Sequence, residues 1–115
     1  MVNIWASWDE TSTRMRDSLY NDVKSLPEKE FRVLNISIDL DKSEWEKKCK
    51  KENEQWIETS DLNGWQNQIV KQMNISKVPY KILVNKNRKI ITSNIYGEEL
   101  TLKVKNLIQE NKNKK

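Results

Sequence analysis

Short apolar runs alternate with longer polar stretches in the first third of this chain, a pattern typical of a strand–helix–strand unit. Residues 2–6 (VNIWA) are too few for a helix and predict a buried strand, and residues 31–39 (FRVLNISID) predict a second one. Between them, a helix is expected to begin among the cap-forming and acidic residues 7–12 and to stop at Pro27. Its apolar face repeats at helical spacing and consists of Met15, Leu19, Val23 and Leu26. Such a unit places its two strands parallel.

The rest of the chain predicts three more helices and a β-hairpin. Residues 42–52 and 64–74 carry apolar side chains at helical spacing, namely Trp45 and Cys49 in the first helix and Trp65, Ile69 and Met73 in the second. Residues 80–84 and 89–94 are strand-like runs joined by the polar turn 85–88, which predicts an antiparallel hairpin. The last helix follows Gly97 and has an apolar stripe of Leu100, Val104, Leu107 and Ile108. This order indicates an α/β fold with a central mixed four-stranded sheet flanked by helices.

A chain of 115 residues is long enough for one domain with a single core. We place that domain at residues 1–110 and expect residues 111–115, which contain no apolar side chain, to form a disordered basic tail. The net charge of +4 depends on the tail, because the chain without Lys112, Lys114 and Lys115 has 18 basic and 17 acidic residues. No basic stripe with interleaved aromatic residues occurs elsewhere, so we expect no nucleic-acid partner.

Residue types exclude several kinds of chemistry. With no histidine and one cysteine, the chain can form neither a zinc site of the Cys/His type nor an internal disulfide. We expect no metal and no other cofactor. No apolar stretch approaches the roughly 20 residues of a membrane-spanning helix, so no membrane span is expected. No signal peptide is recognised in these residues, and the cysteine content leaves the compartment undetermined.

Residues 2–8 (VNIWASW) resemble the strand that leads into the active site of thioredoxin-like proteins, especially thiol–disulfide interchange proteins of the TlpA/ResA type. Further segments resemble that family in the same order: 35–39 followed by Trp45, then 61–65, then 75–79 followed by 82–84. The resemblance spans almost the whole chain and implies a thioredoxin-like fold. In the family the first segment is followed by Cys-x-x-Cys, whereas this chain continues Asp9-Glu10-Thr11-Ser12.

The resemblance thus places Asp9 and Ser12 at the two redox-cysteine positions. In the family, the first cysteine reacts as a thiolate at a helix N-terminus and the second resolves the mixed disulfide. Neither a carboxylate nor a hydroxyl can exchange with a disulfide, so we expect no dithiol–disulfide exchange. The two residues either cap the helix, which we favour, or Asp9 provides an anionic point in a binding groove.

Cys49 is the only thiol, and lysines stand at positions 47, 48, 50 and 51. Nearby positive charge lowers the pKa of a thiol and would make Cys49 reactive. On a helix, however, Cys49 shares a face with Trp45, whereas the adjacent lysines point elsewhere. We therefore favour a packed, unreactive cysteine over a single-cysteine enzyme.

Val78 and Pro79 match the active-site loop of the family, in which the proline follows a cis peptide bond. We expect a cis Val78–Pro79 bond and, as the resemblance implies, pairing of an extended peptide with the backbone before the proline. The expected binding face, for an extended peptide or a partner protein, comprises Trp8, Asp9, Ser12, Val78 and Pro79. Tyr80 stands where the family often has a small polar residue and is expected to fill part of the groove. The other interpretation is that the cis peptide only shapes the loop and nothing binds there.

Family members normally have further strands that pair with the edge corresponding to residues 31–39, and this chain begins too late to supply them. We therefore expect an open edge at residues 31–39, which self-association could cover. Three functions are considered: a non-catalytic module that binds a peptide or partner protein, a diverged thiol oxidoreductase that uses Cys49 or partner thiols, and a structural domain of a larger cell-envelope protein. We favour the first. The resemblance suggests a bacterial cell envelope or periplasm as the compartment.

Overall fold

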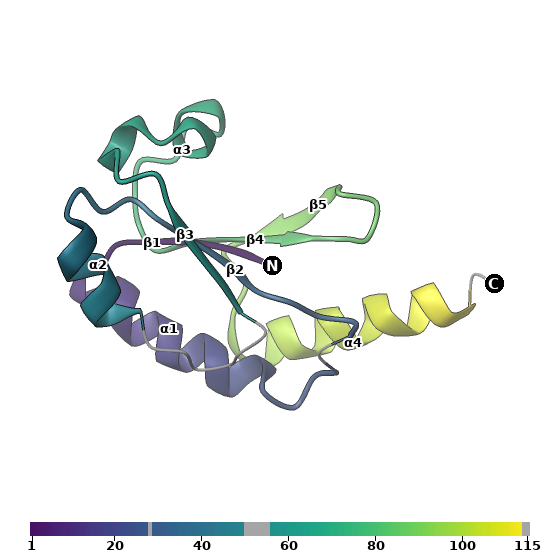
Figure 1. Cartoon of the computed structure of the whole chain (residues 1–115). Helices are drawn as coiled ribbons and strands as arrows, with labels where there is room; N and C mark the ends of the chain where they lie inside the picture. Colours follow the sequence, from purple (N-terminus) through teal and green to yellow (C-terminus); the bar gives the residue numbers. More distant parts are fainter. Residues whose placement is uncertain (28, 50–55, 114–115) are drawn as a thin grey trace.

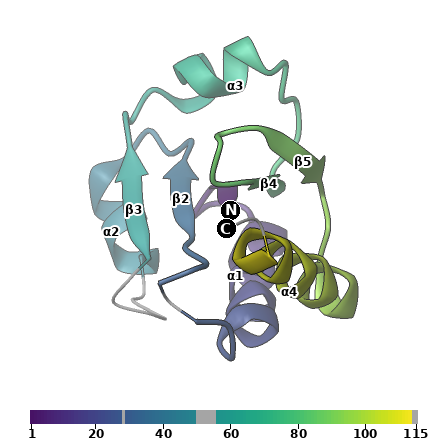
Figure 2. The same cartoon turned by 90° about the vertical axis from the view of Figure 1, so that its right-hand side faces the viewer.

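A computed structural model describes residues 1–27, 29–49 and 56–113 of the chain. Within these residues, five strands form one sheet in the order β3-β2-β1-β4-β5 (Figures 1 and 2). Their bounds are β1 (Val2–Trp5), β2 (Leu34–Ser37), β3 (Ile57–Ser60), β4 (Tyr80–Val84) and β5 (Ile90–Ser93). Strands β1, β2 and β3 are parallel, β4 is antiparallel to β1, and β5 is antiparallel to β4. The predicted α/β class with a mixed sheet and a terminal hairpin is confirmed.

The helices cover the two faces of the sheet unequally. They are α1 (Glu10–Val23), α2 (Lys42–Lys48), the short 3-10 helix η1 (Gly64–Gln66), α3 (Gln68–Gln72) and α4 (Gly97–Asn113). Helices α1 and α4 lie side by side on one face, where the core includes Leu19, Val23, Leu83, Leu100 and Val104 (Figure 2). Helix α3 packs at one end of the other face, where the core includes Ile4, Ile36, Val70, Ile75 and Ile82. The sheet therefore separates two apolar clusters, as period-two alternation along its strands requires.

Strand β3 (Ile57–Ser60) corrects two predictions. The sheet has five strands rather than four, and the edge at residues 31–39 is not open, because β3 pairs in parallel with β2. Self-association through residues 31–39 was expected only because that edge was thought to be open, so the pairing with β3 removes the reason for it. The sequence Ile-Glu-Thr-Ser has one large apolar residue, and short strands of this kind are stabilised by neighbours on the sheet more than by their own propensity.

The helix predicted for residues 64–74 is divided in two. Asn67 has an extended ψ of 133°, and its side-chain oxygen accepts hydrogen bonds from the backbone N–H groups of Ile69 and Val70, which begins α3 as a new helix. The break turns the expected apolar stripe outward, because Trp65, Ile69 and Met73 are all exposed. Gly64, Asn67 and Val70 are buried in their place.

Three predicted helix ends also differ. Helix α1 ends at Val23, before the expected stop at Pro27, so Leu26 lies beyond the helix although its side chain is buried. Helix α2 ends at Lys48, and the predicted continuation over residues 50–52 lies outside the described residues. Helix α4 extends to Asn113, so residues 111–113 of the expected disordered tail are helical. Residues 114–115 lie outside the part of the chain that the structure describes.

Candidate ligand-binding site

The N-terminus of α1 is organised by a hydrogen-bonded pair. Asp9 is the N-cap, with extended backbone angles, and its Oδ2 accepts from the backbone N–H of Ser12 at 2.9 Å and from Ser12 Oγ at 2.8 Å. Ser12 is fully buried, whereas Asp9 is half-buried. The two positions expected to replace a dithiol therefore contact each other directly, and the capping role of Asp9 is confirmed.

The loop from β1 to α1 is fixed by a buried carboxylate. Asp39 follows β2 and accepts from the backbone N–H of Ser7 at 3.2 Å, and from the hydroxyls of Ser7 and Ser37. Its side chain is almost completely buried, so these donors replace the solvation that an ionised carboxylate loses. The loop that presents Trp8 and Asp9 is thereby anchored to the neighbouring strand.

The second segment of the predicted face is the loop that enters β4. The Val78–Pro79 bond is cis, as predicted. In the sheet register Tyr80 lies opposite Ile4, which places this loop beside the end of β1 and its connection to α1 (Figure 1). Trp8, Asp9, Ser12, Val78 and Pro79 thus lie at the same end of the sheet, although only Asp9 and Ser12 are joined by a hydrogen bond described here. The side chain of Trp8 is 59% exposed.

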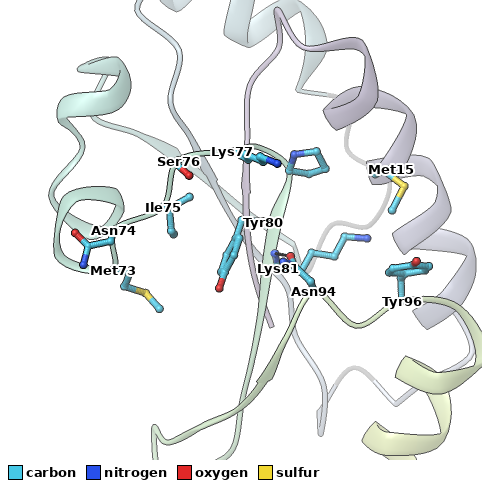
Figure 3. A pocket seen from close by; sticks show the side chains of 11 residues that line it. Met15, Met73, Asn74, Ile75, Ser76, Lys77, Tyr80, Lys81, Asn94 and Tyr96 are labelled. Carbon is cyan, nitrogen blue, oxygen red and sulfur yellow. Dashed lines mark hydrogen bonds between the residues drawn. The ribbon is translucent and has the colours of Figure 1, made fainter.

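A pocket of about 350 Å³ opens beside the cis-proline loop. Pro79, Tyr80 and Lys81 border it on the strand side, and Met15 of α1 and Tyr96 border it on the other side (Figure 3). The remaining lining residues are Met73, Asn74, Ile75, Ser76, Lys77 and Asn94. Tyr80, which was expected to fill part of the groove, lines this pocket, and a cavity of about 350 Å³ remains beside it.

A row of polar side chains crosses the sheet on the face toward α1. Glu58, Asn35, Asn3 and Lys81 are register partners on β3, β2, β1 and β4. Asn35 Nδ2 donates to Glu58 Oε2, and Asn3 Nδ2 donates to Asn35 Oδ1, both at 2.9 Å. Because a carboxylate only accepts, the donors run in one direction and leave the buried Asn3 Oδ1 without a partner. Lys81 Nζ, at the end of the row, is also buried without a hydrogen-bond partner.

The other end of the row is closed by Arg16 of α1. Its guanidinium binds both carboxylate oxygens of Glu58, at 2.7 and 2.9 Å, and lies 4.4 Å from the centre of the Trp5 ring. Such a bidentate pair stacked on an aromatic ring is the arrangement that arginine favours when buried.

Cys49 approaches the same carboxylate. Its Sγ donates to Glu58 Oε1 at 3.6 Å. Burial, and after it the charge of Glu58, raise the pKa of the Cys49 thiol to about 12. This geometry agrees with the packed interpretation of Cys49, whose reactivity stays a prediction.

Comparison with known proteins decides the family. A sequence-family model described as thioredoxin-like matches residues 1–90 of the chain. The chain belongs to the thioredoxin-like family. A search of curated proteins gave no significant match to this thioredoxin-like domain.

Solved structures agree with this assignment. The thioredoxin-like domain is similar to a thiol-disulfide oxidoreductase from Bacteroides fragilis, with 34% identity and a TM-score of 0.74 over 92% of this chain and 78% of that one. It is also similar to the C-terminal domain of a protein described as a thiol-disulfide oxidoreductase from Bacteroides thetaiotaomicron, with 32% identity and a TM-score of 0.76 over 95% and 76% of the two chains. A thioredoxin-like protein from Parabacteroides distasonis shares the fold, at 23% identity and a TM-score of 0.77 over 90% and 77%.

The thioredoxin-like domain is thus related to bacterial thiol–disulfide oxidoreductases, as the sequence resemblance indicated, and with one cysteine it lacks their Cys-x-x-Cys motif. Within residues 1–27, 29–49 and 56–113, no three His, Cys, Asp or Glu side chains are arranged to hold a metal ion. No helix in the described part of the thioredoxin-like domain is long and apolar enough to cross a membrane.

Sequence reasoning missed the polar row and the role of Lys81 in the pocket. The sequence does place a lysine inside the strand-like run 80–84. A charged residue is rarely fully buried without a partner, so a lysine in a predicted buried strand could have indicated a polar or ligand-binding feature there. Nothing in the sequence pairs Arg16 with Glu58, since 42 positions separate them and β3 was not expected.

Proposed function

We propose that this thioredoxin-like domain is a non-catalytic module that binds an extended segment of a partner protein along the cis-proline loop. The observation that carries the proposal is the Asp9–Ser12 pair. It replaces the redox dithiol with a hydrogen-bonded N-cap, which has no sulfur to exchange, while the surrounding fold is retained.

The retained geometry supports binding. The cis-proline loop, the pocket beside it and the exposed Trp8 lie at one end of the sheet, where a peptide in extended conformation can add backbone hydrogen bonds to the loop. Several large apolar side chains are also exposed in the elements and loops at this end of the sheet, namely Trp8, Leu40, Trp65 and Met73. Apolar groups gathered beside an open groove are typical of a protein-binding surface.

The proposal is tested by titrating the ¹⁵N-labelled domain with a blocked heptapeptide of alternating threonine and valine with a central glutamine. We expect chemical-shift changes confined to residues 7–12, 75–81 and 94–96. The matched control is the same peptide N-methylated at its central residue, which removes one backbone donor and should bind more weakly.

An absence of shift changes with millimolar peptide, or changes spread over α4 and β5 instead, would contradict the proposal. Reduction of insulin disulfides by the domain would contradict its non-catalytic part. The Cys49 alternative predicts such turnover, but the thiol is hydrogen-bonded to Glu58 of β3 and does not line the pocket.

We propose further that the domain works in the bacterial cell envelope. The support is that its relatives include thiol–disulfide oxidoreductases, a class that serves compartments where disulfides form and persist. Immunodetection of the full-length natural protein after osmotic shock and fractionation tests this. Recovery in the cytoplasmic fraction alone would contradict it.

A further inference from the structure

Lys81 has a buried side-chain amine and borders an open pocket. The side chain is only 3% exposed, and its Nζ has no hydrogen-bond partner among the residues that the structure describes. It extends from β4 toward the space between Met15 and Tyr96, which border the same pocket (Figure 3). Buried polar groups normally have a partner, so an unpartnered amine at a pocket needs an explanation.

The surrounding charges do not supply one. Asp22 of α1 is the acidic group whose charge favours the ammonium form of Lys81, but neither of its oxygens is hydrogen-bonded to Nζ, and its Oδ2 accepts from the backbone N–H of Gly97 at 2.8 Å. The other ionisable groups that line the pocket are Lys77, which is also cationic, and the phenols of Tyr80 and Tyr96. Burial dominates over Asp22 and lowers the pKa of Lys81 below its usual 10.5.

The remaining lining suits a ligand with an apolar stem. Met15 lies beside the amine and Pro79 also lines the pocket, whereas Met73 and Ile75 provide apolar surface on the other side of β4 (Figure 3). A lysine side chain is flexible and carries three donors, so it can adjust its conformation to donate to a ligand group in the pocket. The site therefore combines a cavity of about 350 Å³, apolar walls and one amine without a hydrogen-bond partner among the described residues.

We propose that this pocket is a specificity subsite for a carboxylate, which pairs with Lys81. Given the proposed function, on which this inference rests, the carboxylate belongs to a glutamate side chain of the extended peptide that lies across the cis-proline loop. The stem of the glutamate contacts the apolar walls, and its carboxylate accepts hydrogen bonds from Nζ. A free organic acid has the same chemistry and is the other source of such a ligand.

Pairing with a carboxylate has a measurable consequence for protonation. A bound anion favours the ammonium form, so binding raises the pKa of Lys81 and is accompanied by proton uptake wherever the free amine is partly deprotonated. Affinity for a glutamate peptide should therefore decrease as the pH rises toward 10.5, whereas affinity for a glutamine peptide should not.

The experiment compares two blocked heptapeptides of alternating threonine and valine, one with central glutamate and one with central glutamine, by calorimetry at pH 7. Wild type should bind the glutamate peptide about tenfold more tightly. The K81M variant, which keeps the unbranched stem and removes the amine, should bind both peptides equally. The matched control K77M removes the other lysine of the pocket lining and should retain the preference.

A third probe, 3-phenylpropionate, separates the two sources of the carboxylate. Equal binding of both peptides to wild type overturns this inference and leaves the proposed function intact. Equal loss of the preference for glutamate in K77M and K81M also overturns it, because a general attraction of the peptide to the lysines of the pocket lining would then explain the preference. If neither peptide binds but 3-phenylpropionate binds in a Lys81-dependent manner, the peptide function fails and the carboxylate site stands. If none of the three probes binds, both proposals are wrong.

Discussion

Cys49 should react slowly with thiol reagents in the folded protein, because two features of its surroundings keep it protonated. It is half-buried, and its Sγ donates to the Glu58 carboxylate at 3.6 Å. Burial first and the charge of Glu58 second raise its pKa from 9.0 to about 12, and the charge of Arg16 acts in the opposite direction. Ionising the thiol would place a second negative charge beside Glu58.

The size of the effect follows from the pKa. At pH 7 the thiolate fraction falls about a thousandfold relative to a thiol of pKa 9.0. A more basic thiolate is also more nucleophilic, by about 16- to 32-fold over such a range, given a Brønsted coefficient of roughly 0.4–0.5. The net expectation is labelling about 30- to 60-fold slower than that of an ordinary exposed cysteine.

The assay is reaction with 5,5′-dithiobis(2-nitrobenzoate), followed by absorbance for the native protein, the denatured protein and N-acetylcysteine. The E58Q variant removes the adjacent charge and should label faster, with its pH midpoint shifted down. The matched control E44Q changes an exposed carboxylate on α2 and should label like wild type. Circular dichroism at each pH verifies that the variants remain folded. Native labelling as fast as that of N-acetylcysteine, with an ordinary pH midpoint, would refute the reasoning and restore the single-cysteine enzyme.

Three further predictions follow from named contacts. The double variant D9C/S12C should close an internal disulfide, since the natural side chains are in direct contact, with 2.8 Å between Asp9 Oδ2 and Ser12 Oγ. On oxidation, the number of titratable thiols should then fall from three to one. Failure of the folded variant to oxidise would show that these are not the family's cysteine positions. K81M should be more stable to urea than wild type at neutral pH, because it removes the desolvation of an unpartnered amine. The wild-type free energy of unfolding should rise with pH from the lowered folded-state pKa of Lys81 toward 10.5, since the unfolded chain binds the proton more tightly in that window; an identical pH dependence in K81M would contradict this. R16M should lower the free energy of unfolding by about 3–5 kcal/mol, because it leaves Glu58 without its bidentate partner, and a loss below about 1 kcal/mol would show that the pair adds little.

Local patterns determined much of the architecture. The helical spacing of Leu19 and Val23 and the cap at Asp9 are properties of adjacent residues, and each has the expected place in α1, whereas the helix ends at Val23 and not at the expected stop, Pro27. Strand β4 and its hairpin were predictable for the same reason. The cis Val78–Pro79 bond was predictable only through resemblance to a family, because most bonds before proline are trans.

The features that only the tertiary structure decided are those that depend on partners distant in sequence. Strand β3 is too short and polar to form without β2 beside it, and the broken helix at Asn67 turns an apparently buried stripe toward solvent. Lys81 shows the same principle at the site. Its charge is visible in the sequence, but its burial results from its register with Asn3 and from the packing of α1 over this face of the sheet, and only the structure shows that its Nζ has no hydrogen-bond partner among the described residues.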